Sequence, residues 1–146
     1  MYWQRRLLET DAQWLVDHAY RLYRFDCDRW SSDQRALVEM GIALEFPDYY
    51  GRNLDAFNDC LGDLEIPVDG GAGIVLLRYD HFAMQSPVAA QAVLDIIADN
   101  ARSFMLFGRR LVTLVQSDNP RLSFDAVGAT PVMWNSSEWL NKNRGL

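Results

Sequence analysis

The sequence predicts an α/β fold in which helices pack on a small three-stranded parallel sheet. Three short segments, at residues 23–27, 74–77 and 111–115, are apolar or alternate in polarity, as strands do. The segments between them carry apolar residues at the spacing of amphipathic helices. Strands that alternate with helices favour a parallel sheet, because parallel neighbours need a crossover connection.

The composition fits one domain that spans residues 1–146. With 49% hydrophobic and 23% charged residues, the chain can bury a sizeable core. We place this core at about residues 22–116, between an N-terminal extension (1–21) that adds a helix and a C-terminal extension (117–146).

The negative charge is concentrated in one part of the chain. The formal net charge is −6, and residues 45–69 alone hold seven acidic residues and one arginine, so the remainder is close to neutral. A concentrated negative field repels nucleic-acid phosphates and steers basic molecules toward it. We therefore expect a basic protein partner and no direct binding of nucleic acid.

The cysteines indicate a reducing compartment. Cys27 and Cys60 lie far apart and lack the spacing of a metal or redox motif, so we expect two buried thiols. The sequence shows no secretory leader and no apolar run long enough to cross a membrane. We expect a cytoplasmic protein without membrane attachment.

The N-terminal part predicts two helices and the first strand. Thr10 and Gln13 form a possible capping box for a helix with Leu15, Ala19 and Leu22 on one face. Alternation at Tyr23, Phe25 and Cys27 predicts the strand. Serines 31 and 32 and Asp33 are candidate caps for a second helix, which would end before Pro47. Its apolar face would comprise Ala36, Leu37, Met40 and Leu44.

A loop and a short helix follow at residues 46–64. Asn53 is well placed as the N-cap, and the apolar positions Leu54, Phe57, Leu61 and Leu64 recur at helical spacing. On another stripe of this helix Asp55, Asp59 and Asp63 follow at four-residue intervals, and each like-charged pair costs about 0.2–0.5 kcal/mol. Tyr49 and Tyr50 form an aromatic pair in the loop, which we expect to be exposed.

The second half predicts two more strands and a long helix. The glycine-rich connector at residues 66–73 is interpreted as a flexible approach to the strand at 74–77; it precedes a strand and lacks the lysine of a phosphate-binding loop. Ser86 and Pro87 suit the start of a helix over residues 88–104, and Gly108 precedes the strand at 111–115.

The C-terminal extension carries large apolar residues. We expect a turn at Asn119-Pro120, a short strand at 131–134, and a terminal turn, capped by Ser136 or Ser137, that carries Trp139 and Leu140. Two interpretations stay open: these groups dock onto the domain, or they form an exposed patch for a partner.

No catalytic constellation stands out. His18 and His81 have no neighbouring ligand at metal spacing, and no serine lies in a nucleophile elbow. Asp55 and Asp59 could in principle act as paired carboxylates, but a convex helix face without other site residues is a poor setting for glycoside hydrolysis. We expect no enzyme activity, no metal and no cofactor.

The run PDYYGRNLDAFNDCL at residues 47–61 resembles the signature loop and helix of the barstar family, the intracellular protein inhibitors of small basic ribonucleases. The resemblance extends more weakly over about residues 22–116, and it implies three parallel strands with helices. It also implies that Asp55 and Asp59 enter the active site of a ribonuclease in place of substrate phosphate, with Asp59 as the deeper anchor.

The resemblance further implies loop contacts by Tyr49, Gly51, Asn53 and Leu54. Asn58, Asp63 and Asp99 complete the expected partner-binding set. Asn58 stands where the type member has tryptophan, Gly62 where it has threonine, and Ser103 where it has an acidic residue. These departures leave the target open: a barnase-like ribonuclease, another nuclease toxin, or no toxin.

The predicted function is that of a monomeric inhibitor or immunity protein that blocks a basic ribonuclease-type enzyme. The alternative is a non-inhibitory interaction or regulatory module on a barstar-like scaffold. In that case the extensions, with Trp3, Trp134 and Trp139, carry the binding. Coverage of the signature helix by the chain's own termini would contradict the predicted inhibitor function.

Overall fold

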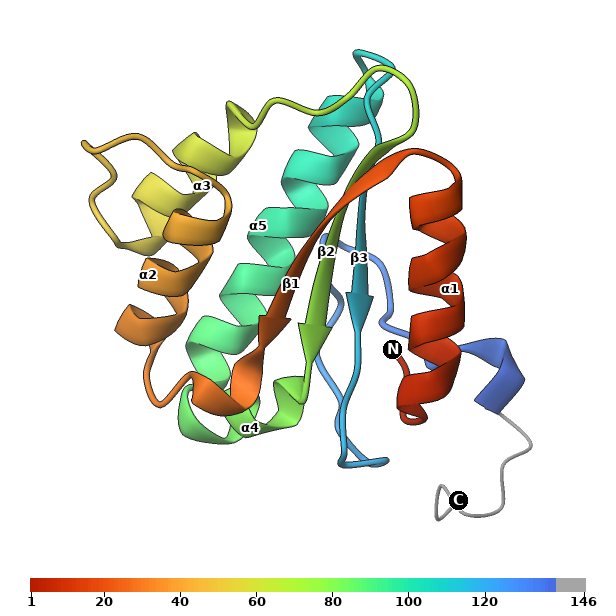
Figure 1. Ribbon diagram of the computed structural model, residues 1–146. Helices are drawn as coiled ribbons and strands as arrows, with labels where there is room; N and C mark the ends of the chain where they lie inside the picture. The colour runs from red at the N-terminus through yellow and green to blue at the C-terminus, as the bar shows by residue number, and fades with distance from the viewer. Residues whose placement is uncertain (139–146) are drawn as a thin grey trace.

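The computed structural model describes residues 1–138, which form a three-stranded parallel sheet packed with helices (Figure 1). The strands are β1 (Tyr20–Asp26), β2 (Gly71–Leu77) and β3 (Leu111–Val115), and β2 lies in the middle. This confirms the α/β fold class predicted from the sequence.

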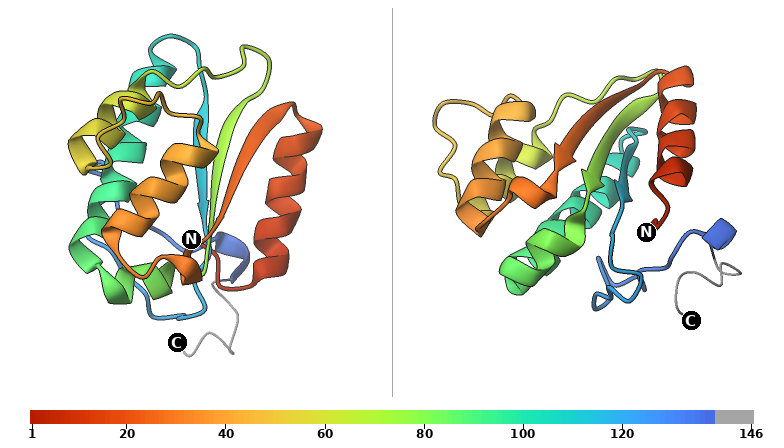
Figure 2. Two further views of the ribbon diagram at one scale, coloured as in Figure 1. Left: turned by 60° about the vertical axis from the view of Figure 1, so that its left-hand side comes forward. Right: turned by 60° about the horizontal axis from the view of Figure 1, so that its bottom comes forward.

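Five α-helices in the described range cover the two faces of the sheet. In Figure 2, α1 lies alone on one face and the other helices lie on the opposite face or below it. Their bounds are α1 (Arg5–Asp17), α2 (Asp33–Ala43), α3 (Leu54–Gly62), α4 (Tyr79–Gln85) and α5 (Pro87–Met105), with 3-10 turns at Cys27–Arg29 and Ser136–Glu138.

The central strand β2 divides the core into two clusters. Successive side chains of a strand point to opposite faces of its sheet. Ile74 and Leu76 therefore enter the larger cluster under α2–α5, whereas Val75 and Leu77 pack with Leu8 and others beneath α1. Because β2 is buried on both faces of the sheet, its sequence is a continuous apolar run.

Gly71 and Gly73 are part of β2 and only Gly70 lies in the bend before it, so the interpretation of all three as a flexible approach was wrong. A Cβ at Gly71 would lie 2.5 Å from the carbonyl oxygen of Arg110, and one at Gly73 would lie 2.5 Å from Cδ2 of Leu22. The absence of side chains lets neighbouring strands and side chains pack closely at this end of the sheet.

The N-terminal helix begins earlier than predicted. It starts at Arg5, and Thr10 lies inside it, where its hydroxyl donates to the carbonyl of Arg6. Ala19, predicted within the helix, instead has a φ of +63° and turns the chain into β1, which includes Leu22. The capping box was therefore wrong, and the local sequence does not contain the group that stabilises the helix start.

That group is the carboxylate of Glu138, which is fully buried at the start of α1. Its two oxygens accept the backbone N–H groups of Trp3 and Gln4 at 2.7 and 2.5 Å. Unpaired N–H groups at a helix start favour a negative charge, so this contact stabilises α1. It also fixes the described part of the C-terminal extension beside the N-terminus (Figure 1).

The predicted strand at 131–134 is wrong. Nearby, the chain follows the N-terminus through single backbone hydrogen bonds, from Met1 N to Met133 O at 2.5 Å and from Asn135 N to Met1 O at 2.6 Å. Asn135, not a serine, caps the final 3-10 turn, because its side chain accepts the N–H of Ser137. Trp139 and Leu140 lie outside the described residues.

The remaining helices confirm their predicted starts, with one addition. Ser32 caps α2, Asn53 caps α3 and Pro87 begins α5. The sequence analysis missed α4, whose buried Phe82 packs edge-on against Trp30 with ring centroids 5.2 Å apart. At seven residues, directly before Pro87, α4 is too short to show a clear helical period.

Gly71→Ala is expected to lower the free energy of unfolding by about 1–3 kcal/mol, because its Cβ would meet backbone that cannot move aside. Gly73→Ala is the control in the same strand and should cost less, since the crowded atom is the end of the flexible Leu22 side chain. Urea denaturation of both variants tests this, and equal costs would contradict it.

Candidate partner-binding surface

The loop before α3 is held by Tyr50, which is half-buried; its expected exposure was wrong. The Tyr50 hydroxyl donates to the carbonyl of Leu37 at 3.2 Å, and the ring packs edge-on against Phe46. Gly41 makes room for the ring, because a Cβ there would lie 2.5 Å from it. Burial raises the pKa of Tyr50 to about 12. Only the neighbouring Tyr49 is presented to solvent, at 81% exposure.

The start of α3 is fixed by Asn53. Its side-chain oxygen accepts the backbone N–H of Ala56 at 2.9 Å, as predicted for the N-cap. Phe57 and Leu61 are fully buried and Leu54 is half-buried against the core. The cap and this apolar face fix both the position and the rotation of the helix.

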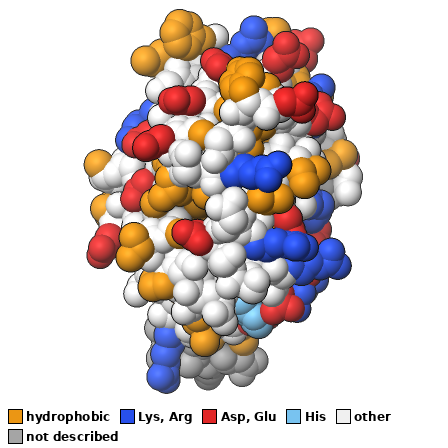
Figure 3. Space-filling model, turned by 90° about the vertical axis from the view of Figure 1, so that its left-hand side faces the viewer, with side chains coloured by type: hydrophobic (Ala, Val, Ile, Leu, Met, Phe, Trp, Pro, Cys, Tyr) orange, Lys and Arg blue, Asp and Glu red, His pale blue; other side chains and the backbone are white. Residues whose placement is uncertain are grey.

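The outward stripe of α3 carries the three predicted carboxylates. Asp55, Asp59 and Asp63 are all exposed, and within residues 1–138 none of them forms an ion pair. Figure 3 shows the face of the molecule formed by α2 and α3, with acidic side chains spread over its upper half. The start of the helix dipole favours a negative charge at Asp55, whereas Asp59 and Asp63 lie beyond the first turn of α3 and gain nothing from it.

Cys60 lies on the inner side of α3. The thiol is buried, as predicted for both cysteines, and Cys27 is buried as well. Burial raises the pKa of Cys60, and the charges of Asp59 and Asp63 raise it further. Cys60 therefore stays protonated and apolar in character.

A contact that the sequence analysis missed joins α3 to α5. The buried Asn100 donates through Nδ2 to the side-chain oxygen of Asn58 and to the carbonyl of Ile96, both at 2.9 Å. Gly62 lies against the same amide, since a Cβ there would be 3.1 Å from Oδ1 of Asn100. The small residue at 62 and the amide at 58 thus serve the packing of α3 on α5. The sequence contained one sign of this contact, which is that the polar Asn100 stands among the apolar positions of α5.

Asp99, predicted as a partner contact, is exposed on α5 but is not a free carboxylate. It forms an ion pair with Arg102, whose guanidinium also donates to the carbonyl of Gly128. Binding of a cation at Asp99 would compete with Arg102.

Up to residue 138, the C-terminal extension leaves the α3 side of α5 uncovered. It is tied to α5 through Gln91, Asp95 and Arg102, which bond to the backbone of residues 125 and 128. At 100° per residue these three positions share one side of α5, opposite Asn100. Tyr49, Gly51, Asn53, Asp55, Asn58, Asp59 and Asp63 are accordingly all exposed.

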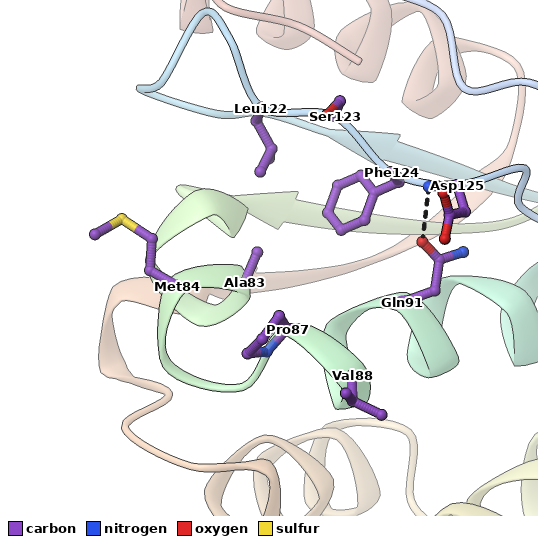
Figure 4. Close-up of a pocket in the computed structure, with 9 residues that line it drawn as sticks. All are labelled: Ala83, Met84, Pro87, Val88, Gln91, Leu122, Ser123, Phe124 and Asp125. Atoms are coloured by element: carbon purple, nitrogen blue, oxygen red, sulfur yellow. Dashed lines mark hydrogen bonds between the residues drawn. The ribbon is translucent and has the colours of Figure 1, made fainter.

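A hollow of about 510 Å³ lies elsewhere, between α4, the start of α5 and residues 122–125 (Figure 4). Its lining is mostly apolar, and Asp125 is the charged residue among those that form it. Gln91 accepts the backbone N–H of Asp125 at 3.1 Å across one side. Besides this carboxylate, the lining offers only the hydroxyl of Ser123, and no histidine, lysine or cysteine that could activate it.

The histidines have neighbours that sequence spacing did not reveal. His18 stacks on Trp14, and Nδ1 of His81 lies 2.6 Å from a carboxylate oxygen of Asp28. Within residues 1–138 no group of three or more histidine, cysteine or acidic side chains is placed to hold a metal ion. No helix in that range is long and apolar enough to cross a bilayer.

A comparison with known protein families assigns the chain to one of them. Residues 20–116 match the family described as Barstar (barnase inhibitor), a span that begins with β1 and ends just after β3. The chain belongs to the barstar family. No curated protein matches the sequence. Helix α1 and the C-terminal extension lie outside the matched span.

We expect Asn58→Ala and Asn100→Ala to show energetic coupling. In a double-mutant cycle followed by urea denaturation, the amide hydrogen bond should give a coupling of about 0.5–1.5 kcal/mol. Asn58→Ala alone should destabilise the fold, because it leaves one N–H of a buried amide unpaired. Additive effects of the two substitutions would show that the contact does not hold α3 to α5.

Proposed function

We propose that this protein inhibits a basic ribonuclease-type enzyme by inserting the outward side of α3 into its active site. The observation that carries the proposal is the stripe of exposed, unpaired carboxylates at Asp55, Asp59 and Asp63, on a helix matched to a family of barnase inhibitors. Carboxylates repel one another at this spacing, so a binding role accounts for a cost that folding does not require.

The chemistry is mimicry of a phosphate. An active site that binds RNA presents cationic side chains to the phosphodiester, and a carboxylate forms short, charge-assisted hydrogen bonds with such groups. Asp59 lies between Asp55 and Asp63, so it experiences both like charges in the free protein, and the resemblance to the barstar family implies that it is the deeper anchor. Tyr49, Gly51, Asn53 and Leu54 supply contacts around it.

Support also comes from the rigidity of the surface. The Asn53 cap, the Tyr50 hydroxyl and the Asn58–Asn100 contact hold the loop and helix before any partner arrives. Preorganised groups lose little conformational entropy on binding, which raises affinity. Asn58 and Asp99 already have intramolecular partners, so we place them at the rim.

The proposal includes a monomeric, non-enzymatic, cytoplasmic protein that needs no cofactor. The alternative, in which the extensions carry the binding, has less support. The described part of the C-terminal extension serves the fold, since Glu138 caps α1 and residues 125 and 128 bond to α5.

Asp59→Ala should abolish most binding to the target ribonuclease without destabilising the fold. In the complex, loss of the carboxylate leaves cationic groups of the enzyme unpaired and costs about 2 kcal/mol or more of binding free energy. In the free protein, the same loss relieves a few tenths of a kcal/mol of repulsion. Titration calorimetry against a panel of small basic ribonucleases that includes barnase, with thermal denaturation alongside, measures both effects.

Asp125→Ala is the matched control, because it removes an exposed carboxylate on the far side of α5. It should leave affinity unchanged. Destabilisation by Asp59→Ala with unchanged affinity would make Asp59 a structural residue, and the absence of binding to any ribonuclease of the panel would reject the proposed function.

Association with the ribonuclease should be electrostatically steered, an effect for which barstar with barnase is the reference case. The on-rate should fall as salt rises from about 10 mM, where the Debye length is about 30 Å, to 150 mM, where it is about 8 Å. Stopped-flow measurements should show a shallower fall for a variant with Asp55, Asp59 and Asp63 changed to Asn. An on-rate independent of salt would contradict steering.

A further inference from the structure

Three consecutive large apolar side chains project into solvent at the end of α5. Met105, Leu106 and Phe107 are exposed by 69%, 84% and 79%; we call these residues the apolar knob. Single exposed apolar residues are ordinary on protein surfaces, but a contiguous group usually marks a site of interaction.

The backbone of the knob is fixed by a helix cap. Arg109 N–H donates to the carbonyl of Phe104, and Gly108 N–H donates to that of Met105, at 3.0 and 3.1 Å. With Gly108 at a φ of +70°, this is the Schellman arrangement. The cap uses only backbone groups of these residues, so the fold does not require apolar side chains at 105–107.

The knob lies at the same end of the molecule as Asp63. Helices α3 and α5 run side by side toward one end of the sheet (Figure 1), and Asn58 and Asn100 mark the same level. Leu106 is about 9 Å beyond Asn100 along α5, and Asp63 is about 8 Å beyond Asn58 along α3, at 1.5 Å per residue. In Figure 3 hydrophobic side chains lie at the top of the face, next to acidic ones.

The knob is too small to be a stable interface by itself. Large side chains cover about 150–250 Å² each, so three fall short of the roughly 800 Å² that one partner contributes to a standard interface. It needs adjoining surface, and α3 ends at the same end of the molecule.

We propose that the apolar knob is a second contact region for the same basic enzyme, and that it packs into an apolar recess beside the enzyme's cationic active site. The inference rests on the proposed function. An anionic membrane is a poorer fit for the knob. Arg109 and Arg110 contact the connector at Ile66 and Gly70. The same connector carries the acidic Glu65 and Asp69, which anionic lipids would repel. In the complex the carboxylates of α3 supply charge and the knob supplies apolar contact.

The test compares two double variants of the full chain. Leu106→Ser with Phe107→Ser removes the knob, and Met84→Ser with Val88→Ser removes two side chains of similar exposure, 75% and 82%, around the hollow at the far end. Titration calorimetry uses the ribonuclease of the panel that binds the wild type most tightly. We expect Kd to rise at least tenfold for the knob variant, with its salt dependence and Tm unchanged, and to stay within twofold for the control.

The outcomes separate the two proposals. Wild-type affinity in the knob variant, with binding lost in Asp59→Ala, would overturn this inference and leave the proposed function intact. No binding of the wild type to any ribonuclease would overturn the proposed function, and the inference with it. A wild-type dimer that the knob variant dissociates, or co-sedimentation with phosphatidylserine vesicles that the variant abolishes, would assign the knob to another occupant. Leu106→Gln alone repeats the measurement if the double variant does not fold.

Discussion

The position of α3 depends on the contact between two amides, Asn100 on α5 and Asn58 on α3. Asn100 is buried and reaches out of the apolar core to the exposed helix, and Gly62 leaves room for the close approach. Helix α3 has only nine residues, and a helix of that length has little stability without tertiary packing. The amide contact, the Asn53 cap and the buried Phe57 and Leu61 together hold it at one angle to the sheet.

This arrangement leaves one side of α3 free to carry charge. Some acidic groups elsewhere are paired: Asp26 meets Arg78, whose hydrogen bond lowers the pKa of Asp26, and Glu9 meets Arg24. The carboxylates of α3 have no such partner within residues 1–138. Under the proposed function, the unpaired, like-charged groups of α3 lower stability in exchange for recognition, and the proposed contact by the apolar knob adds a second kind of interaction.

The two extensions support this surface from outside the matched family span. Helix α1 covers the second face of the sheet, and Glu138 fixes its start from the other end of the chain. The chain segment that leads from β3 to Glu138 packs on α5 from the side opposite Asn100. Within residues 1–138 the additions therefore complete the fold without covering α3.

Local patterns predicted most of the fold, because strand alternation, helical spacing, the Asn53 cap and Pro87 act over a few residues. The same patterns located the carboxylate stripe. The predictions that failed concern features that depend on contacts between residues distant in sequence. The start of α1 needs Glu138, and the glycines of β2 are explained by Arg110 and Leu22. Tyr50 is buried by residues of α2. The role of Asn58 was missed as well, since its partner lies 42 residues away and only the polar character of Asn100 pointed to it.

The most direct test of phosphate mimicry is inhibition kinetics in the presence of a competing nucleotide. A ribonuclease of the panel is assayed with increasing inhibitor at several concentrations of a mononucleotide product that occupies its phosphate site. If α3 takes the place of the phosphate, the apparent Ki should rise in proportion to nucleotide occupancy of the site. Inhibition that is unaffected by the nucleotide would show that the protein binds outside the active site and would contradict the account.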